Sequence, residues 1–121
     1  MILSFLGVFG RGGKILELTS HNFENIINAN PYILVNFYSP FCKYCIRFAP
    51  EFKKTAKKIF KKRKFITVAQ IDAANETAIA NQQGIERYPT LKFFKHSIPC
   101  RYDGPQESAK ILQWMERHIA K

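Results

Sequence analysis

Acidic side chains and cysteines are scarce in this chain of 121 residues, and no long apolar run interrupts it. A membrane-spanning helix needs about 20 consecutive apolar residues, which excludes a spanning segment here, and we expect no membrane contact. The three cysteines are too few for a framework of structural disulfides and suit one pair plus a separate thiol. The chain is nevertheless 46% hydrophobic and 14% aromatic, which predicts one compact, ordered domain.

The shortage of acid leaves a strong positive balance: 19 Lys and Arg stand against 9 Asp and Glu, a formal charge of +10. The basic residues crowd into 53–64, where apolar residues recur at spacings of three and four. This pattern predicts an amphipathic helix with a buried stripe and a solvated basic face. Such an excess can also bind nucleic acid, but the nearby aromatics belong to the buried stripe. We therefore expect no nucleic-acid partner.

Two cysteines three positions apart follow an apolar strand and open a predicted helix. Cys42 and Cys45 would share one helix face and could close a small disulfide ring. The unpaired N–H groups at a helix start favour a thiolate, which is the attacking species in disulfide exchange. The spacing therefore predicts a redox-active pair.

Half of a zinc site is the alternative interpretation of these two cysteines. A structural zinc usually has four ligands, and no second close pair is available to supply the rest. We expect neither a metal nor another cofactor, and we interpret Cys100 as a half-buried apolar residue that could also form an intermolecular disulfide. The remaining candidate ligands are scattered: His21, His96, Cys100 and His118.

Strand-like and helix-like segments alternate along the chain. This order predicts an α/β domain in which a central sheet carries helices on both faces and ends in an antiparallel hairpin. The strands are expected at 15–18, 32–38, 65–71, 90–95 and 100–103, and the helices around 23–27, 42–63, 76–82 and 107–120. Residues 14–121 form the predicted domain. Residues 1–13 are interpreted as an N-terminal extension or the remnant of a targeting segment.

Three motifs, at residues 37–51, 84–94 and 102–105, resemble the thioredoxin superfamily, and specifically the catalytic domain of protein disulfide isomerases. The family pattern Phe-Tyr-Ala-Pro-Trp-Cys-Gly-His-Cys, followed by Ala-Pro-Glu, is similar to residues 37–45 and 49–51. The family's Gly-x-x-x-Tyr-Pro-Thr before a Lys-Phe-Phe strand is similar to residues 84–94. The segment 102–105 is a third similarity, and together the motifs span about residues 14–120. The resemblance implies the thioredoxin fold, a central mixed sheet of about five strands flanked by four helices.

The resemblance also implies a division of roles within the site. Cys42 would be the more exposed thiol that attacks or accepts the mixed disulfide, and Cys45 the buried thiol that resolves it. Pro89 would follow a cis peptide bond and pack against the cysteines, leaving the backbone of Tyr88 to hydrogen-bond an extended substrate. Phe41 would complete the substrate-binding rim.

This chain departs from the family at positions that manage protons. Family members carry a buried acidic residue where this chain has Asn36, and usually a lysine where it has Gln70. An amide pair can hydrogen-bond without the desolvation penalty of two buried charges. What is lost is a proton acceptor for Cys45.

Two further departures lie close to the same thiols. An arginine that modulates the buried cysteine in many isomerase domains is replaced by Gln106, and the usual Gly-His between the cysteines is Lys43-Tyr44. The histidine that stabilises the thiolate is thereby lost, although Lys43 can partly compensate. We expect slower exchange and a less oxidising disulfide than in typical isomerase domains.

Two functions of different classes follow from the resemblance. The first is a thiol–disulfide oxidoreductase or isomerase acting on cysteine-containing unfolded or misfolded proteins, with glutathione or another redox partner. The alternative is a peptide-binding, chaperone-like module with vestigial redox activity, whose surface is the apolar rim of Phe41, Tyr44, Tyr88 and Pro89. The family implies the lumen of the endoplasmic reticulum and the secretory pathway, and we expect a monomer.

Overall fold

A computed structural model describes residues 13–120 of the chain. The predicted extension at residues 1–13 therefore lies outside the described residues, apart from Gly13. No helix within the described range has the length and apolar character needed to cross a membrane.

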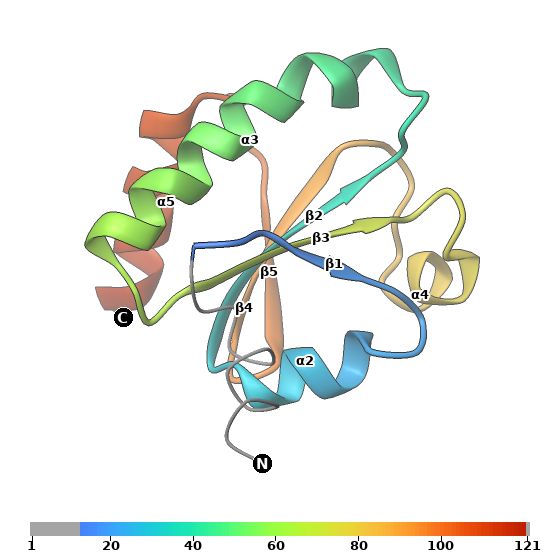
Figure 1. Ribbon diagram of the computed structural model, residues 1–121, viewed down its shortest axis with the longest axis horizontal. Helices are drawn as coiled ribbons and strands as arrows, with labels where there is room; N and C mark the ends of the chain where they lie inside the picture. The colour runs from blue at the N-terminus through green and yellow to red at the C-terminus, as the bar shows by residue number, and fades with distance from the viewer. Residues whose placement is uncertain (1–12, 121) are drawn as a thin grey trace.

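The described chain contains five strands and four helices, as expected for the thioredoxin fold (Figure 1). The predicted and observed boundaries agree within about two residues at most elements, because strand alternation and helical periodicity are strong local signals. In chain order the elements are β1 Leu16–Leu18, α2 Phe23–Ala29, β2 Tyr32–Tyr38, α3 Lys43–Lys62, β3 Thr67–Asp72, α4 Thr77–Gln82, β4 Thr90–Lys95, β5 Ile98–Tyr102 and α5 Ser108–Ala120.

The strands form one mixed sheet in the order β1-β3-β2-β4-β5. The pairs β1–β3 and β2–β3 are parallel, whereas β2–β4 and β4–β5 are antiparallel. β2 is thus the central strand and is buried along most of its length, as its nearly continuous apolar sequence predicts. It ends at Tyr38, immediately before the segment that carries the two cysteines.

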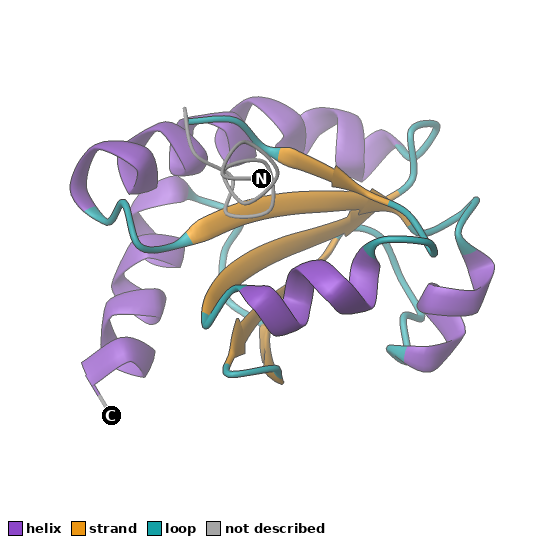
Figure 2. Ribbon diagram, turned by 60° about the horizontal axis from the view of Figure 1, so that its bottom comes forward, coloured by secondary structure: helices purple, strands orange, loops and turns teal. Residues whose placement is uncertain are grey.

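Helices cover both faces of the sheet and divide the core into two clusters (Figure 2). The face under α2 and α4 buries Phe23, Phe37 and Phe94. The face under α3 and α5 buries Phe52 and Phe93 together with other large side chains. Because neighbouring residues of a strand point to opposite faces, the even-numbered residues of β2 face α3.

The hairpin between β4 and β5 is tighter than the sequence predicts. β5 begins at Ile98 rather than Cys100, and Lys95 pairs directly with Ile98. The two residues between them, His96 and Ser97, both have positive φ, of 49° and 71°. Positive φ at both positions is the two-residue hairpin geometry usually supplied by Asn-Gly, so the sequence His-Ser gives little warning of it.

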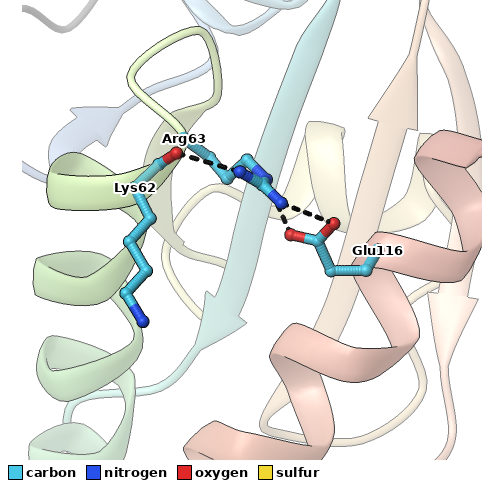
Figure 3. Close-up of polar contacts among 3 residues, drawn as sticks. All are labelled: Lys62, Arg63 and Glu116. Atoms are coloured by element: carbon cyan, nitrogen blue, oxygen red, sulfur yellow. Dashed lines mark hydrogen bonds and ion pairs between the residues drawn. The ribbon is translucent and has the colours of Figure 1, made fainter.

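Two polar contacts fix α5 against α3. The Glu51 carboxylate on α3 accepts a hydrogen bond from the backbone N–H of Ser108, the first residue of α5, at 2.8 Å. Arg63, which follows the last residue of α3, pairs with Glu116 through two nitrogens, at 2.7 Å and 2.9 Å (Figure 3). The two contacts thus hold α5 against α3 near the start of α5 and in its second half.

Candidate active site

The two predicted redox cysteines lie at the start of α3, where β2 delivers the chain to one margin of the molecule (Figure 1). Cys42 is the N-cap of α3, with extended backbone, and its thiol is half-buried. Cys45 lies in the first helical turn and is only 6% exposed. Both are free thiols, and no acidic residue occupies the first turn of the helix. The structure thus describes the reduced pair with one accessible and one covered sulfur.

The surroundings move the two thiol pKa values in opposite directions. The backbone N–H of Cys45 is the main group that lowers the pKa of Cys42, helped by the Cys45 thiol and the Tyr44 N–H. Burial is the main cause that raises the pKa of Cys45, to about 11, and the proximity of Cys42 adds to it. The Ser39 N–H, 3.4 Å from the Cys45 sulfur, opposes this rise without cancelling it. The accessible thiol is therefore the one that ionises first.

The backbone of Tyr88 approaches the accessible thiol directly. Cys42 Sγ donates to the Tyr88 carbonyl oxygen at 3.6 Å, and the Tyr88–Pro89 peptide bond is cis. The two segments are 46 residues apart in the chain. The Tyr88 carbonyl therefore lies beside the accessible thiol, and Pro89 follows it after the cis bond. The thiol itself uses the carbonyl that the sequence analysis left free for a substrate.

The aromatic side chains near the thiols divide into exposed and packed ones. Phe41 is 92% exposed and Tyr44 is 62% exposed, and the Arg47 guanidinium lies 5.8 Å from the centre of the Tyr44 ring. Tyr88, by contrast, packs partly against the core cluster under α2 and α4. The predicted rim therefore consists of two projecting rings and a recessed segment at Tyr88 and Pro89.

Three residues form a row across the sheet on the side that faces α3. Glu17 pairs in register with Gln70, and Gln70 pairs with Asn36. Asn36 is 4% exposed, and its Oδ1 has no hydrogen-bond partner among the described residues. Gln70 Nε2 donates instead to Glu17 Oε1 at 2.8 Å. The direct amide pairing that the sequence allowed is therefore not the arrangement found.

Glu17 is a functional candidate that the sequence analysis missed. Its second carboxylate oxygen accepts from the Tyr38 hydroxyl at 2.9 Å. Burial, followed by this hydrogen bond, raises the pKa of Tyr38, and the charge of Cys45 contributes to the rise. A carboxylate is thus linked to the polar row near the buried thiol, but from the short edge strand β1. Only the parallel pairing of β1 with β3, distant in sequence, could have located it.

The remaining predicted site residues lie at different distances from the thiols. Lys43 is exposed at the start of α3. Gln106 is exposed and shares a surface cleft with Pro89. Cys100 lies apart from the redox pair, with its sulfur 3.3 Å from His118 Nε2. Within residues 13–120, no three His, Cys, Asp or Glu side chains gather closely enough to hold a metal ion.

Comparison with known sequences gives matches over most of the chain. Residues 14–117 match the family described as Thioredoxin. The chain is 40% identical over 100 residues to protein disulfide-isomerase A4 of Mus musculus, covering 83% of this chain and 16% of that protein. It is 38% identical over 103 residues to protein disulfide-isomerase of Drosophila melanogaster, covering 85% and 21%. The chain thus spans about a sixth to a fifth of these relatives.

Solved structures give the same relationship at the level of the fold. The first thioredoxin domain of mouse protein disulfide-isomerase A4 superposes with a TM-score of 0.80 at 30% identity, covering 90% of this chain and 77% of that one. Human ERp44 superposes with a TM-score of 0.81 at 25% identity, covering 86% of this chain and 29% of that one.

Proposed function

Because this chain belongs to the thioredoxin family and is homologous to protein disulfide-isomerases, we propose that it is a thiol–disulfide oxidoreductase acting on protein substrates. The observation that carries the proposal is the asymmetry of the cysteine pair. The half-buried Cys42 has a lowered pKa, and the buried Cys45 has a pKa raised to about 11. An attacking thiol needs to ionise and be reachable, whereas a resolving thiol needs to stay protonated until a mixed disulfide has formed.

The reaction transfers two electrons between the protein dithiol and a substrate disulfide. The Cys42 thiolate attacks one substrate sulfur; a mixed disulfide forms, the substrate S–S bond breaks, and the other substrate sulfur leaves as a thiolate. Cys45 then loses its proton and attacks the Cys42 sulfur. This step releases the second substrate thiolate, which takes up a proton, and leaves a Cys42–Cys45 disulfide. The same steps in reverse oxidise a substrate dithiol.

The segment around Pro89 and the ring of Phe41 bind the substrate in this proposal. Phe41 is 92% exposed and is free to cover an extended peptide. The Tyr88 carbonyl lies 3.6 Å from the Cys42 sulfur, so a peptide bound to the Tyr88 backbone brings its own sulfur to the nucleophile. Substrates of this class are unfolded or misfolded proteins that contain cysteine, with glutathione or another thiol as the redox partner.

The substitutions at proton-managing positions make this domain slower and less oxidising than typical isomerase domains. Asn36 is buried on the face of the sheet that is covered by α3, and its amide cannot accept a proton as a carboxylate would. Gln106 is neutral, and Lys43 and Tyr44 replace the usual Gly-His between the cysteines. None of these four residues can take up the Cys45 proton as a carboxylate or imidazole would. Glu17 is the carboxylate bound to this polar row, through Gln70 and Tyr38.

A second candidate function is peptide binding without turnover, in which redox activity is vestigial. The observation that favours it is the large apolar exposure around the thiols, where Phe41, Tyr44 and Ile46 are 92%, 62% and 61% exposed. Exposed aromatic surface binds unfolded chains of varied sequence. The two candidates differ in whether they depend on Cys42.

Equilibration of the protein with glutathione buffers tests the proposal. We expect a Cys42–Cys45 disulfide to form reversibly, at a potential more reducing than that of a typical isomerase domain measured alongside. Cys42→Ser should abolish insulin reduction and refolding of scrambled substrate, whereas Cys100→Ser, the matched control, should leave both intact. Retention of aggregation suppression by Cys42→Ser, with no turnover in the unsubstituted protein, would favour the binding module instead.

The cellular setting is proposed from the family. The relatives named above are protein disulfide-isomerases, which supports the lumen of the endoplasmic reticulum as the site of action. The proposal also includes a domain boundary near residue 14 and a monomeric state. A turnover number that does not change with protein concentration would support the monomer.

A further inference from the structure

Two adjoining clefts open beside the segment that contacts Cys42. The larger, of about 290 Å³, is lined by Arg87, Lys92 and Arg101 together with Glu86 and other residues. The smaller, of about 210 Å³, shares Arg87, Thr90 and Arg101 with the first and adds Pro89. Because three residues line both, we treat them as one feature, the basic cleft. Its larger part lies on the face of β4 and β5 that is turned away from α3 and α5, and its smaller part extends to the loop before α5.

The basic cleft concentrates positive charge on neighbouring strands. Lys92 and Arg101 are directly paired across β4 and β5, an arrangement that is unfavourable for like charges. Burial, and next the charge of Arg101, lowers the pKa of Lys92. The Lys92 ammonium donates to the Gln83 carbonyl at 2.5 Å and lies 5.8 Å from the Phe37 ring, and it forms no ion pair with a carboxylate of the described residues.

The available counter-charges are few and exposed. Arg101 pairs with Asp103 at 3.1 Å, where the two side chains are 58% and 73% exposed, so solvent weakens that pair. Glu86 lines the larger part of the cleft and is exposed. Three cations therefore face two carboxylates that water screens, and an added anion would relieve the repulsion between the strands.

The cleft begins beside the reaction centre. Arg87 and Pro89 flank Tyr88, whose carbonyl oxygen lies 3.6 Å from Cys42 Sγ. Thr90 Oγ1 donates to the Arg87 carbonyl at 2.7 Å, which fixes the backbone of this segment. An extended peptide advances about 3.3 Å per residue, so a side chain about one to three positions from a cysteine bound at Cys42 reaches the cleft.

We propose that the basic cleft binds a carboxylate side chain that lies close to the reacting cysteine of a peptide substrate. The inference rests on the proposed function and adds a substrate class to it: cysteines with Asp or Glu as near neighbours. Arg87 and Arg101 supply the paired N–H donors that fit a carboxylate, and Lys92 supplies a partly desolvated charge at the back of the cleft. Arg87, Lys92 and Arg101 are specificity-determining residues, distinct from the two thiols that react.

The test compares three peptides that each contain one internal disulfide. They differ only at the position two residues from one of the cysteines, where they carry Glu, Gln or Lys. The reduced protein is mixed with each peptide under single-turnover conditions. Samples are quenched with acid, and the fraction of reduced peptide is measured by mass spectrometry. We expect the Glu peptide to react at least about threefold faster than the Gln peptide and the Lys peptide to be slowest, with the differences shrinking as salt is raised.

Paired charge-removing variants separate the cleft from the net charge of the protein. Arg87→Gln with Arg101→Gln should bring the three rates within about 1.5-fold of one another, because the carboxylate loses its donors. Lys57→Gln with Lys58→Gln removes the same charge from the distant face of α3 and should preserve the preference. Equal rates in the unsubstituted protein, or the same loss of preference in both variants, would overturn the proposal.

Cysteine-free versions of the peptides, with serine at both positions, keep the test independent of turnover. Fluorescence anisotropy should show tighter binding of the Glu peptide to the unsubstituted protein than to Arg87→Gln with Arg101→Gln. If no disulfide peptide is reduced but this difference is present, the proposed oxidoreductase function fails and the cleft stands. If turnover proceeds without any peptide preference, the cleft fails and the oxidoreductase stands.

Discussion

Asn36 and Gln70 are paired in register on β2 and β3, yet Gln70 donates to Glu17 and the buried Asn36 Oδ1 has no partner in the described part of the chain. A buried acceptor without a donor lowers stability, since it loses water and gains nothing in return. Its position on the strand face that looks toward α3 makes it the natural place to probe proton transfer at the buried thiol.

Asn36→Asp should increase the rate of the resolving step and decrease stability. A carboxylate at this position could accept the Cys45 proton, and we expect turnover to rise by about tenfold, a modest part of what a positioned acid–base group contributes. A rise of about one to two units in the pKa of the buried carboxyl would cost about 1–3 kcal/mol of unfolding free energy at pH 7. Single-turnover kinetics and urea denaturation measure the two effects.

The pH dependence of the Asn36→Asp stability follows from the direction of the pKa shift. Burial would raise the pKa of the new carboxyl, so the folded state holds its proton to higher pH than the unfolded chain. The penalty should be absent below the unfolded pKa of about 4 and grow as the pH rises above it. Asn36→Leu is the control that removes the amide without adding an acid. A pH-independent penalty would contradict this account.

Alkylation should modify the two redox cysteines in different pH ranges. The thiolate is the reactive form, and the pKa of Cys42 is lowered whereas burial raises that of Cys45 to about 11. Iodoacetamide at pH 7 should therefore label Cys42 well before Cys45, and labelling of Cys45 should increase only as the pH approaches 11. Peptide mapping by mass spectrometry of the Cys100→Ser protein gives the two rates, and equal rates at pH 7 would contradict the assignment.

Cys45→Ser should trap the substrate as a mixed disulfide on Cys42. In the unsubstituted protein, Cys45 resolves the mixed disulfide intramolecularly. In the variant an external thiol has to attack instead, which should slow release of the substrate on the order of a hundredfold or more. Nonreducing electrophoresis would show the trapped complex. The matched variant Cys42→Ser should trap nothing, and accumulation of a complex on Cys45 in that variant would reverse the assigned roles.

Substitutions of Glu51 and Ser108 should change the free energy of unfolding in different ways. Glu51→Gln weakens the charged acceptor at the start of α5, so we expect a loss of about 1 kcal/mol. Ser108→Ala removes a buried hydroxyl that has no partner among the described residues, so stability should be unchanged or rise by up to about 1 kcal/mol. Urea denaturation measures both. Glu107→Gln, which removes a charge near the same helix end, is the control and should have a smaller effect than Glu51→Gln.

Most of the fold was predictable because its elements carry strong local signals. The unbroken apolar run of β2 and the period of apolar residues in α3 located those elements within one or two residues. The start of β5 was wrong by two residues, since the His96–Ser97 turn lacks the glycine or asparagine that usually marks a positive φ.

The site was predictable only where its residues are close in the sequence or belong to a motif. Cys42 and Cys45 were selected as candidates from their spacing, and Pro89 from the family motif. The contact of Glu17 with Gln70 spans 53 residues, and that of Cys100 with His118 joins a strand to a helix. Such pairs depend on strand register and helix packing, which no local pattern contains.

In the proposed function, the exposure of Phe41, just before α3, and of Tyr44, in its first turn, would limit which disulfides can reach Cys42. Because these two rings project on either side of Cys42 in the sequence, the surface there is convex. A folded substrate whose disulfide lies below its own surface would clash with the rings. A flexible, unfolded segment can adapt to the same convex surface without a clash. Shape alone would therefore direct the chemistry toward chains that have not yet acquired, or have lost, their final conformation.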